Sequence, residues 1–301
     1  MPTPPRPPRG LFVGLATLDV AHHVDRAPGP DEKVTATATH LSAGGPAANA
    51  AVTFAALGGR ATLLTALGAS AAAQLVRADL ERHGVTVLDT TPDARTDPPV
   101  SAATVQTATG RRSVVGSDAV ASDAPPPPDL AALAAAVDVV LLDGHHPRLA
   151  IAAAASARAA GTPVVLDLGR WKPVMAELVP AADHVVASAD ARAPGTHDVD
   201  DSARELSRLG APVVVVTRGD DPVSWWAADD DHGDAPVPAV RAVDTLGAGD
   251  AFHGAYAHAV ARGQEVPDAV VHAVEVASLR VQHTGPRAWL AHLPATPEAA
   301  R

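Results

Sequence analysis

The stretch DTLGAGDAFHG, residues 244–254, combines three glycines with two aspartates, and an apolar, alanine-rich segment follows it. This pattern predicts a helix that begins near Gly247 to Gly249. Backbone N–H groups at a helix start lack partners within the helix, and together with the helix dipole they favour an anion. Asp250 would lie beside that anion and accept a proton from a substrate hydroxyl. The alternative is an ordinary acidic residue in the first turn of a helix.

This glycine-rich stretch does not match either of two common phosphate-binding motifs. A P-loop needs G-x-x-x-x-G-K-[ST], and the chain has no such run. The dinucleotide fingerprint needs G-x-G-x-x-G, but Phe252 follows Gly247 and Gly249 where the third glycine is required. The anion site predicted here is therefore of another kind.

A second glycine turn lies in SAGGPAANAAVTFAALGG, residues 42–59. Gly44 and Gly45 precede an alanine-rich helical segment that contains Asn49. A neutral amide on the first turns of a helix is suited to hydrogen bonding with hydroxyl groups. The alternative is a glycine turn that only caps the helix.

Five short apolar runs alternate with alanine-rich helical segments such as 147–161 and 200–210. The runs are residues 10–19, 61–68, 137–144, 162–169 and 211–219. This alternation predicts an α/β fold with a parallel sheet and helices on both faces. Ligands bind beyond the carboxyl ends of the strands in such sheets. The residues expected at that edge are Asp19, Asp143, Asp167 and Gly219.

Two polar segments rich in Thr and Val interrupt the α/β pattern, at about 24–41 and 96–118. Their alternation predicts antiparallel strands with one wet face. We expect them to form a small β-sheet that projects as a lid from a single domain spanning 1–301. A homodimer through this lid is expected, because unpaired strand edges invite partners. The sequence after Thr284 predicts a loop followed by a loose tail.

Composition limits the function. The chain has a formal charge of −11 and no basic block, so we expect no nucleic-acid partner. It has no cysteine, which excludes disulfides and thiolate catalysis and agrees with a cytoplasmic protein. The start lacks the apolar core of a signal peptide, and residues 149–161 are too short to span a bilayer, so no membrane role is expected.

The two glycine stretches together resemble the two signatures of the PfkB, or ribokinase-like, family of carbohydrate kinases. GGPAANAA, with Gly58 and Gly68 at the family's spacing, is similar to the N-terminal signature, and DTLGAGDAF is similar to the C-terminal one. The resemblance covers nearly the whole chain. It implies a three-layer fold with a mostly parallel central sheet flanked by helices and a small projecting β lid.

The resemblance also implies a role for individual residues. Asp250 matches the catalytic base, and the residues that match the anion hole facing the transferred phosphate are Gly247, Ala248 and Gly249. The residues that match contacts to the sugar hydroxyls are Asp19, Gly44, Gly45 and Asn49. Thr217 and Gly219, together with Gly249, match nucleotide-binding positions. Asp244 and Gly285 match a site for a monovalent cation such as K⁺. ATP with Mg²⁺ is the implied phosphoryl donor.

The chain departs from the family at two places near the nucleotide. An N-x-x-E motif that helps to organise Mg²⁺ is replaced by Ser188 and Ala191. Pro222 follows the VTRG segment where many members have another glycine, so we expect a stiffer nucleotide loop.

The leading hypothesis is ATP-dependent phosphorylation of a primary hydroxyl of a small sugar. Within the family, the chain most resembles ketohexokinases and sulfofructose kinases, in the stretches GLATLDVAHHVDRAP, GRRSVVGSDA and VVLLDGHHP. Lys33 fits a sulfosugar but His145 stands where an arginine is expected, so a plain ketose is favoured. A nucleoside kinase is one alternative, although only 3% of the residues are aromatic and a base needs an apolar or aromatic slot. A non-catalytic sugar-binding regulator is the other.

Overall fold

The computed structural model describes residues 6–117, 124–228 and 231–294. Its central sheet has nine strands in the order β13-β12-β11-β10-β9-β8-β1-β4-β5. The strands are β1 (Arg9–Val13), β4 (Arg60–Thr65), β5 (Val85–Asp89), β8 (Val139–Leu142), β9 (Val164–Leu168), β10 (His184–Ser188), β11 (Val213–Arg218), β12 (Asp221–Trp226) and β13 (His232–Ala235). All neighbours pair in parallel except β12, which is antiparallel to both β11 and β13. The predicted mostly parallel α/β sheet is confirmed.

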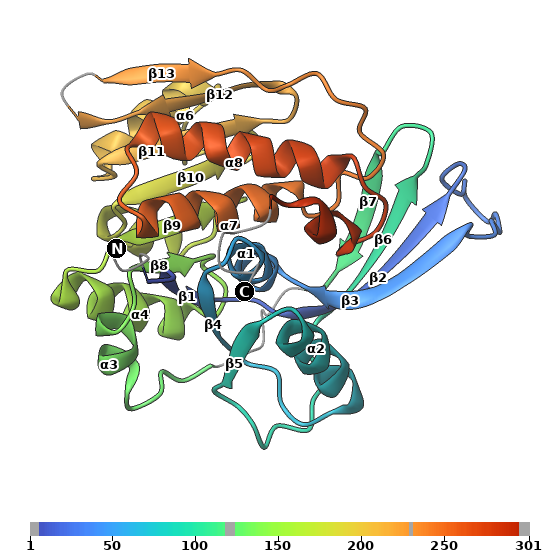
Figure 1. Ribbon diagram of the computed structural model, residues 1–301, viewed down its shortest axis with the longest axis horizontal. Helices are drawn as coiled ribbons and strands as arrows, with labels where there is room; N and C mark the ends of the chain where they lie inside the picture. The colour runs from blue at the N-terminus through green and yellow to red at the C-terminus, as the bar shows by residue number, and fades with distance from the viewer. Residues whose placement is uncertain (1–5, 118–123, 229–230, 295–301) are drawn as a thin grey trace, which may run out of the picture.

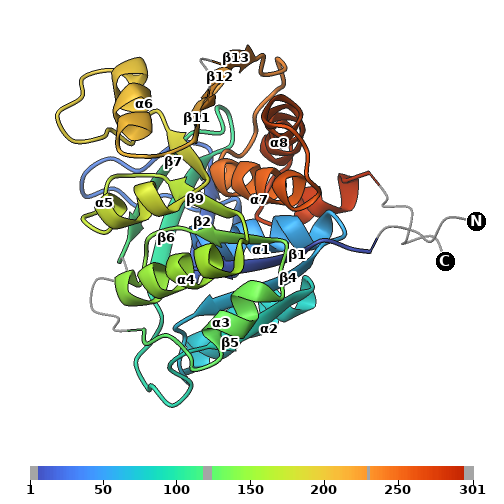
Figure 2. The same ribbon diagram turned by 90° about the vertical axis from the view of Figure 1, so that its left-hand side faces the viewer.

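Helices cover both faces of this sheet and make three layers (Figure 2). One face packs against α1 (Pro46–Ala56), α2 (Ala71–Arg82), α7 (Ala248–Ala261) and α8 (Val266–Val281). The other packs against α3 (Leu130–Ala135), α4 (Pro147–Ala160), α5 (Met175–Leu178) and α6 (Val199–Arg208). Successive strand residues point to opposite faces, so Leu141 joins the first core and Leu142 the second. Such doubly buried strands explain the continuous apolar runs of the sequence.

A second sheet projects from the main body, on the right of Figure 1. Its four strands lie in the order β3-β2-β6-β7 and are β2 (Thr17–Val24), β3 (Ala38–Gly44), β6 (Val100–Gln106) and β7 (Arg112–Gly116). The β2–β6 pair is parallel, so the expectation of purely antiparallel strands is wrong. The lid segment predicted at 24–41 also has the wrong limits, since its two strands occupy 17–24 and 38–44. The end of the other predicted segment, residue 118, lies outside the described residues.

Asp19 lies in this second sheet, and the prediction that it ends the first strand of the main sheet is therefore wrong. The apolar run at 10–19 divides into β1 and β2, with a break at Gly14 to Ala16. A side chain at Gly14 would collide with the carboxylate of Asp143, which occupies the space beside the break. The break redirects the chain from the central sheet into the lid.

Two other loop expectations are also corrected. The acidic segment after Gly219 forms β12, and Pro222 lies within this strand of a hairpin with β11. The segment after Thr284 contains a 3₁₀-helix, η3 (Ala288–His292), and a shorter one, η1 (Val179–Ala181), follows α5. The rest of the predicted tail, from residue 295, lies outside the described residues. Within the described part of the chain, every helix is too short or too polar to cross a bilayer.

Candidate active site

The glycine turn of residues 244–254 starts helix α7, as predicted. Gly247 is its N-cap, with the left-handed φ of 75°, and the helix runs from Ala248 to Ala261. Ala251 is the residue whose amide bonds back to Gly247 O, at 3.0 Å. The amide of Ala248 donates to Thr245 O, outside the helix, at 3.3 Å. The amides of Gly249 and Asp250 have no acceptor four residues back within the helix, which is the condition for an anion site.

The reason for glycine differs between the two positions of this turn. Gly247 has the positive φ that glycine accepts most readily. Gly249 lies inside α7 without a positive φ, and a Cβ there would meet no atom within 4 Å. The backbone conformation therefore requires glycine at position 247 and not at position 249. The open space in front of Gly249 leaves room for a ligand.

Gly44 and Gly45, the first glycine pair, each leave space for a different neighbouring group. A Cβ on Gly44 would overlap the carboxylate of Asp19, which lies across the β2–β3 ladder. Gly45 has a φ of 97° and caps α1, and a Cβ there would collide with Leu15 O. The pair therefore brings Asp19 close to the start of α1, where Asn49 stands.

Asp143, at the end of β8, fixes the start of α1. Its Oδ2 accepts hydrogen bonds from the amides of Leu15, at 2.8 Å, and Ala47, at 3.2 Å. Burial opposes its ionisation, but His145, Lys172 and the amide of Leu15 outweigh that effect and hold the pKa of Asp143 well below its usual value. The carboxylate expected at the sheet edge thus holds the N-terminus of the helix that carries Asn49.

Helices α1 and α7 approach closely because Gly254 has no side chain. A Cβ at Gly254 would lie 2.4 Å from Ala50 O and 2.7 Å from Thr53 Cβ. This close packing brings the two glycine stretches together. Asn49 Nδ2 donates a hydrogen bond of 2.7 Å to Asp250 Oδ2.

The surroundings of Asp250 favour a proton acceptor that works near neutral pH. Burial raises the pKa of Asp250 to about 6, and the negative charge of Asp167 adds to the rise, while Asn49 and His253 oppose it. His253 Nε2 lies 3.3 Å from Asp167 Oδ1, and its Nδ1 contacts Gly249 O at 2.6 Å. A general base is most effective when its pKa lies near the working pH. His253 was not anticipated from the sequence.

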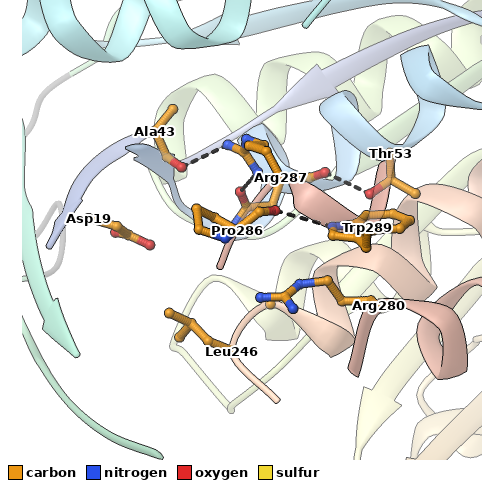
Figure 3. A pocket seen from close by; sticks show the side chains of 10 residues that line it. Asp19, Ala43, Thr53, Leu246, Arg280, Pro286, Arg287 and Trp289 are labelled. Atoms are coloured by element: carbon orange, nitrogen blue, oxygen red, sulfur yellow. Dashed lines mark hydrogen bonds between the residues drawn. The ribbon is translucent and has the colours of Figure 1, made fainter. Parts of the chain in front are cut away.

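A pocket lies between the second sheet and the start of α7. Its lining is formed by Asp19, Ala43, Asn49, Thr53, Leu246, Gly247, Arg280, Pro286, Arg287 and Trp289. Asp250 adjoins the pocket through its contact with Asn49. Figure 3 shows Arg287 at the centre of this lining, with Asp19 on one side and Arg280 below.

Arg287 crosses the pocket and was not singled out in the sequence. It donates to Ala43 O at 2.8 Å (Figure 3) and to Asn49 Oδ1 at 3.0 Å. Its Nη2 also pairs with Asp79 Oδ2 at 3.2 Å. Both ends of the Asn49 amide are therefore held by protein groups, Asp250 and Arg287. If Asn49 binds a sugar hydroxyl, as predicted, it does so while its amide is held by these two residues.

Asp244 is buried and surrounded by donors. It accepts from the amides of Leu246 and Gly285 at 3.0 and 2.9 Å and contacts His23 Nε2 at 3.1 Å. The Arg280 guanidinium lies 3.4 Å from the carboxylate. Burial alone would raise the pKa of Asp244, but Arg280 and these hydrogen bonds leave that pKa below its usual value. The two predicted cation-site residues, Asp244 and Gly285, are thus in direct contact.

Two of the three predicted nucleotide residues, Thr217 and Gly219, lie at the end of β11 and outside the lining of this pocket, whereas the third, Gly249, lies in the first turn of α7. Thr217 belongs to the strand, and Gly219 follows it with a φ of 72° and open space around its Cβ position. Ser188 ends the neighbouring strand β10, whose last residue pairs with Thr217. Parallel strands β10 and β11 thus present these residues at their shared carboxyl edge, where ligands bind in such sheets.

Comparison with known proteins decides the family. Residues 10–292 match the pfkB family of carbohydrate kinases. The chain belongs to the PfkB family. The match includes the lid strands, both glycine turns and the Arg287 loop, so the expected resemblance is confirmed. This PfkB chain is a kinase that transfers a phosphoryl group to a sugar or a nucleoside.

Curated relatives of this PfkB chain act on different sugars. A ribokinase of Arabidopsis thaliana is 27% identical over 91% of the chain and 76% of the relative. The ketohexokinase of Mus musculus is 24% identical over 89% of the chain and 94% of the relative. An ATP-dependent ribose-1-phosphate kinase of Halopiger xanaduensis is 30% identical, over 81% of the chain and 82% of the relative.

Solved structures agree on the fold. A candidate ribokinase from Agrobacterium tumefaciens is 31% identical, superposes with a TM-score of 0.84, and the match covers 95% of this PfkB chain and 94% of that one. The Arabidopsis thaliana ribokinase in complex with ribose and ATP has a TM-score of 0.75 at 24% identity, with 97% of this chain and all of that one covered. The ribokinase-like fold predicted from the sequence is confirmed.

Proposed function

We propose that the protein phosphorylates a primary hydroxyl of a small neutral sugar with ATP, a ketose being the first candidate. The observation that carries the proposal is the 2.7 Å contact between Asn49 and Asp250. It holds a carboxylate with a pKa of about 6 in the first turn of α7, next to the pocket. A proton acceptor next to an anion site is the arrangement that phosphoryl transfer to an alcohol requires.

The proposed mechanism divides the work among three groups of residues. Asp19 and Asn49 orient the sugar through its hydroxyls. Asp250 takes the proton of the attacking hydroxyl, and the amides at Ala248 and Gly249 face the charge that develops on the transferred phosphoryl group. In-line attack then leaves the phosphate ester on the sugar and ADP as the leaving group.

The charges of the pocket favour a neutral sugar. Both arginines in the lining have carboxylate partners, since Arg287 pairs with Asp79 and Arg280 with Asp244. An anionic sugar would have to compete with these buried pairs. Asp19, whose pKa is raised by burial, offers an acceptor that suits a hydroxyl donor. The second candidate, a nucleoside, would use Trp289, the aromatic residue in the described lining, as its base contact.

For the nucleotide we propose Thr217 and Gly219 as contacts, with Mg²⁺ carried on the ATP phosphates. The described residues contain no group of three or more His, Cys, Asp or Glu side chains that could hold a metal ion. Magnesium in kinases is commonly held by one or two carboxylates together with substrate phosphates. Asp167 and Asp250 fit this role, because the negative charge of Asp167 raises the pKa of Asp250 and a nearby cation would relieve that repulsion. When bound, the ion would neutralise charge on the phosphates.

A homodimer through the lid is also proposed. Two edge strands, β3 and β7, end the second sheet, and exposed apolar side chains lie on it at Leu41, Val114 and Val115. Open edges and exposed apolar residues support pairing with a second copy. Sedimentation velocity at several concentrations tests the assembly, with Val115→Glu as the variant expected to weaken it.

The substrate is tested with an ADP-release assay over a panel of compounds at saturating Mg²⁺-ATP. The panel contains D-fructose, D-ribose, D-ribose 1-phosphate, D-fructose 6-phosphate, adenosine and cytidine. We expect the highest kcat/KM with a neutral sugar and at least about tenfold lower values with the phosphorylated sugars, because one missing or opposed charge interaction costs about 1.4 kcal/mol or more. A nucleoside as the best substrate would overturn the proposal, and Asp250→Asn controls for contaminating kinases.

A further inference from the structure

Arg280 is a buried arginine in the middle of the predicted cation site. It lies near the end of α8, and its side chain is 2% exposed, against 1% for Asp244. Charged side chains are almost never buried to this degree unless they are paired. Its guanidinium therefore needs partners, and the structure supplies three oxygen atoms from two loops.

The three oxygens come from the loop before α7 and the loop after α8. Nη1 of Arg280 donates to Asp244 O at 3.3 Å and to His283 O at 3.0 Å. Nη2 lies 3.4 Å from the Asp244 carboxylate. The guanidinium thus joins the segment that leads into the anion-hole turn to the loop that contains Gly285.

A monovalent metal ion needs the same kind of environment. K⁺ would be held by main-chain carbonyls and a carboxylate oxygen, and the resemblance places it at Asp244 and the Gly285 loop. In this chain the carboxylate of Asp244 and the carbonyls around it already face a positive charge. The carboxylate oxygens of Asp244 also accept hydrogen bonds from the amides of Leu246 and Gly285 and contact His23. The residues therefore do not fit an additional cation.

We infer that Arg280 is a built-in replacement for the monovalent cation, so that this kinase does not depend on K⁺. The guanidinium supplies a permanent charge at the same two loops, and its planar fork bonds to fixed oxygens. As a positioning residue, it holds Asp244, whose Oδ1 accepts from Leu246 just before the turn at Gly247. Its charge also acts on Asp250.

The inference depends on the kinase activity of the family and not on which sugar is the substrate. It also has a readout that requires no substrate. A ligand that binds only the folded protein raises its stability as the ligand concentration exceeds its Kd. A functional K⁺ site would therefore raise the melting temperature in KCl above that in an equal concentration of choline chloride, and a site filled by Arg280 would not.

The first experiment uses the unmodified protein. Melting temperature and turnover are measured in 100 mM choline, sodium and potassium chloride, at about the same ionic strength so that charge screening is constant. We expect the melting temperatures to agree within about 1 °C and the turnover within about twofold, since no cation binds the folded state preferentially. A K⁺-specific rise in melting temperature, or a tenfold rise in turnover, would overturn the inference even if the best sugar remained unknown.

The second experiment opens the site. Arg280→Ala removes the charge and leaves space among the three oxygens, and Arg280→Lys keeps the charge without the fork. We expect Arg280→Ala to lose at least tenfold in turnover in choline and to recover in part with K⁺, and Arg280→Lys to be affected less. Arg204→Ala, at an exposed arginine that pairs with Asp201 on the surface of α6, is the matched control. An Arg280→Ala variant that is fully active in choline would contradict the positioning role.

Discussion

Asn49 Nδ2 donates to Asp250 Oδ2 at 2.7 Å, so the amide of the first glycine stretch directly contacts the carboxylate of the second. The two residues stand 201 positions apart in the chain and come from α1 and α7. A hydrogen bond to the charged form of an acid lowers its pKa. Asn49 therefore tunes the proposed base in addition to its proposed contact with the sugar, and neither motif by itself indicates this tuning role.

Removal of this amide should shift the pH dependence of the reaction. In Asn49→Ala, Asp250 loses a contact that opposes its raised pKa of about 6, so its pKa should rise further. The acid limb of the kcat/KM profile reports the pKa of the free base and should move to higher pH, by up to about one unit. Pre-steady-state or initial rates from pH 5 to 8.5 measure the shift. The neighbouring Thr53→Val, which changes the pocket but not this contact, should keep the same midpoint, and an unmoved limb in Asn49→Ala would contradict the tuning role.

Neutralising the base should separate activity from stability. Asp250→Asn removes the proton acceptor and should lower turnover by about 10²–10⁴-fold. The folded-state pKa of about 6 lies above the unfolded value of 3.8, so ionised Asp250 weakens the fold progressively between those pH values and fully above them. The variant should therefore melt at or above the wild-type temperature at pH 7.5, with a gain on the order of 1–3 kcal/mol. Thermal melting at pH 5 and 7.5 tests the sign, because the gain should shrink at the lower pH.

The architecture could be predicted because its signals are local. Buried parallel strands produce continuous apolar runs, and alanine-rich segments between them form the covering helices. The start of α7 followed from a glycine turn before an apolar segment. What these patterns do not contain is the pairing of distant strands, so the parallel contact of β2 with β6 and the position of Asp19 in the lid were predicted wrongly.

The missing parts of the site depend on contacts between residues far apart in the chain. Asp143 holds α1 through the amide of Ala47, and no local pattern in the sequence points to that bond. Arg287 lies in a short irregular segment where there is no periodicity to interpret. Arg280 could have been noticed in the sequence, because a charged residue inside an apolar helical segment is unusual unless it pairs with an oppositely charged residue in the folded protein. The location of the strain at Gly247 rather than Gly249 is a property of backbone angles, which two nearby glycines leave undetermined.

Arg287 should matter for folding and for sugar binding. Asp79 is buried, and Arg287→Ala would leave it with a weaker set of partners and would free Asn49 Oδ1. Breaking a buried pair by removing one partner costs on the order of 3–5 kcal/mol. Arg82 supplies a matched control, because it also pairs with Asp79, at 3.6 Å, but is 70% exposed. Urea unfolding should show a loss of less than about 1 kcal/mol for Arg82→Ala. Equal losses in the two variants would mean that the Arg287 pair is not the one that holds the pocket.

The glycine turn permits the sharpest comparison, between two positions separated by one residue. Gly247→Ala places a side chain at a left-handed φ of 75° and should cost about 1–2 kcal/mol of stability. Gly249→Ala meets open space at an ordinary helical position, so the melting temperature should stay level or rise, since alanine favours a helix by about 0.5–1 kcal/mol over glycine. The added methyl at position 249 would nevertheless project where the transferred phosphate is proposed to lie. Single-turnover phosphoryl transfer should therefore fall sharply in the variant that melts normally. If Gly249→Ala transfers phosphate at the wild-type rate, the first turn of α7 does not form the anion hole and Gly249 is only a position in a helix.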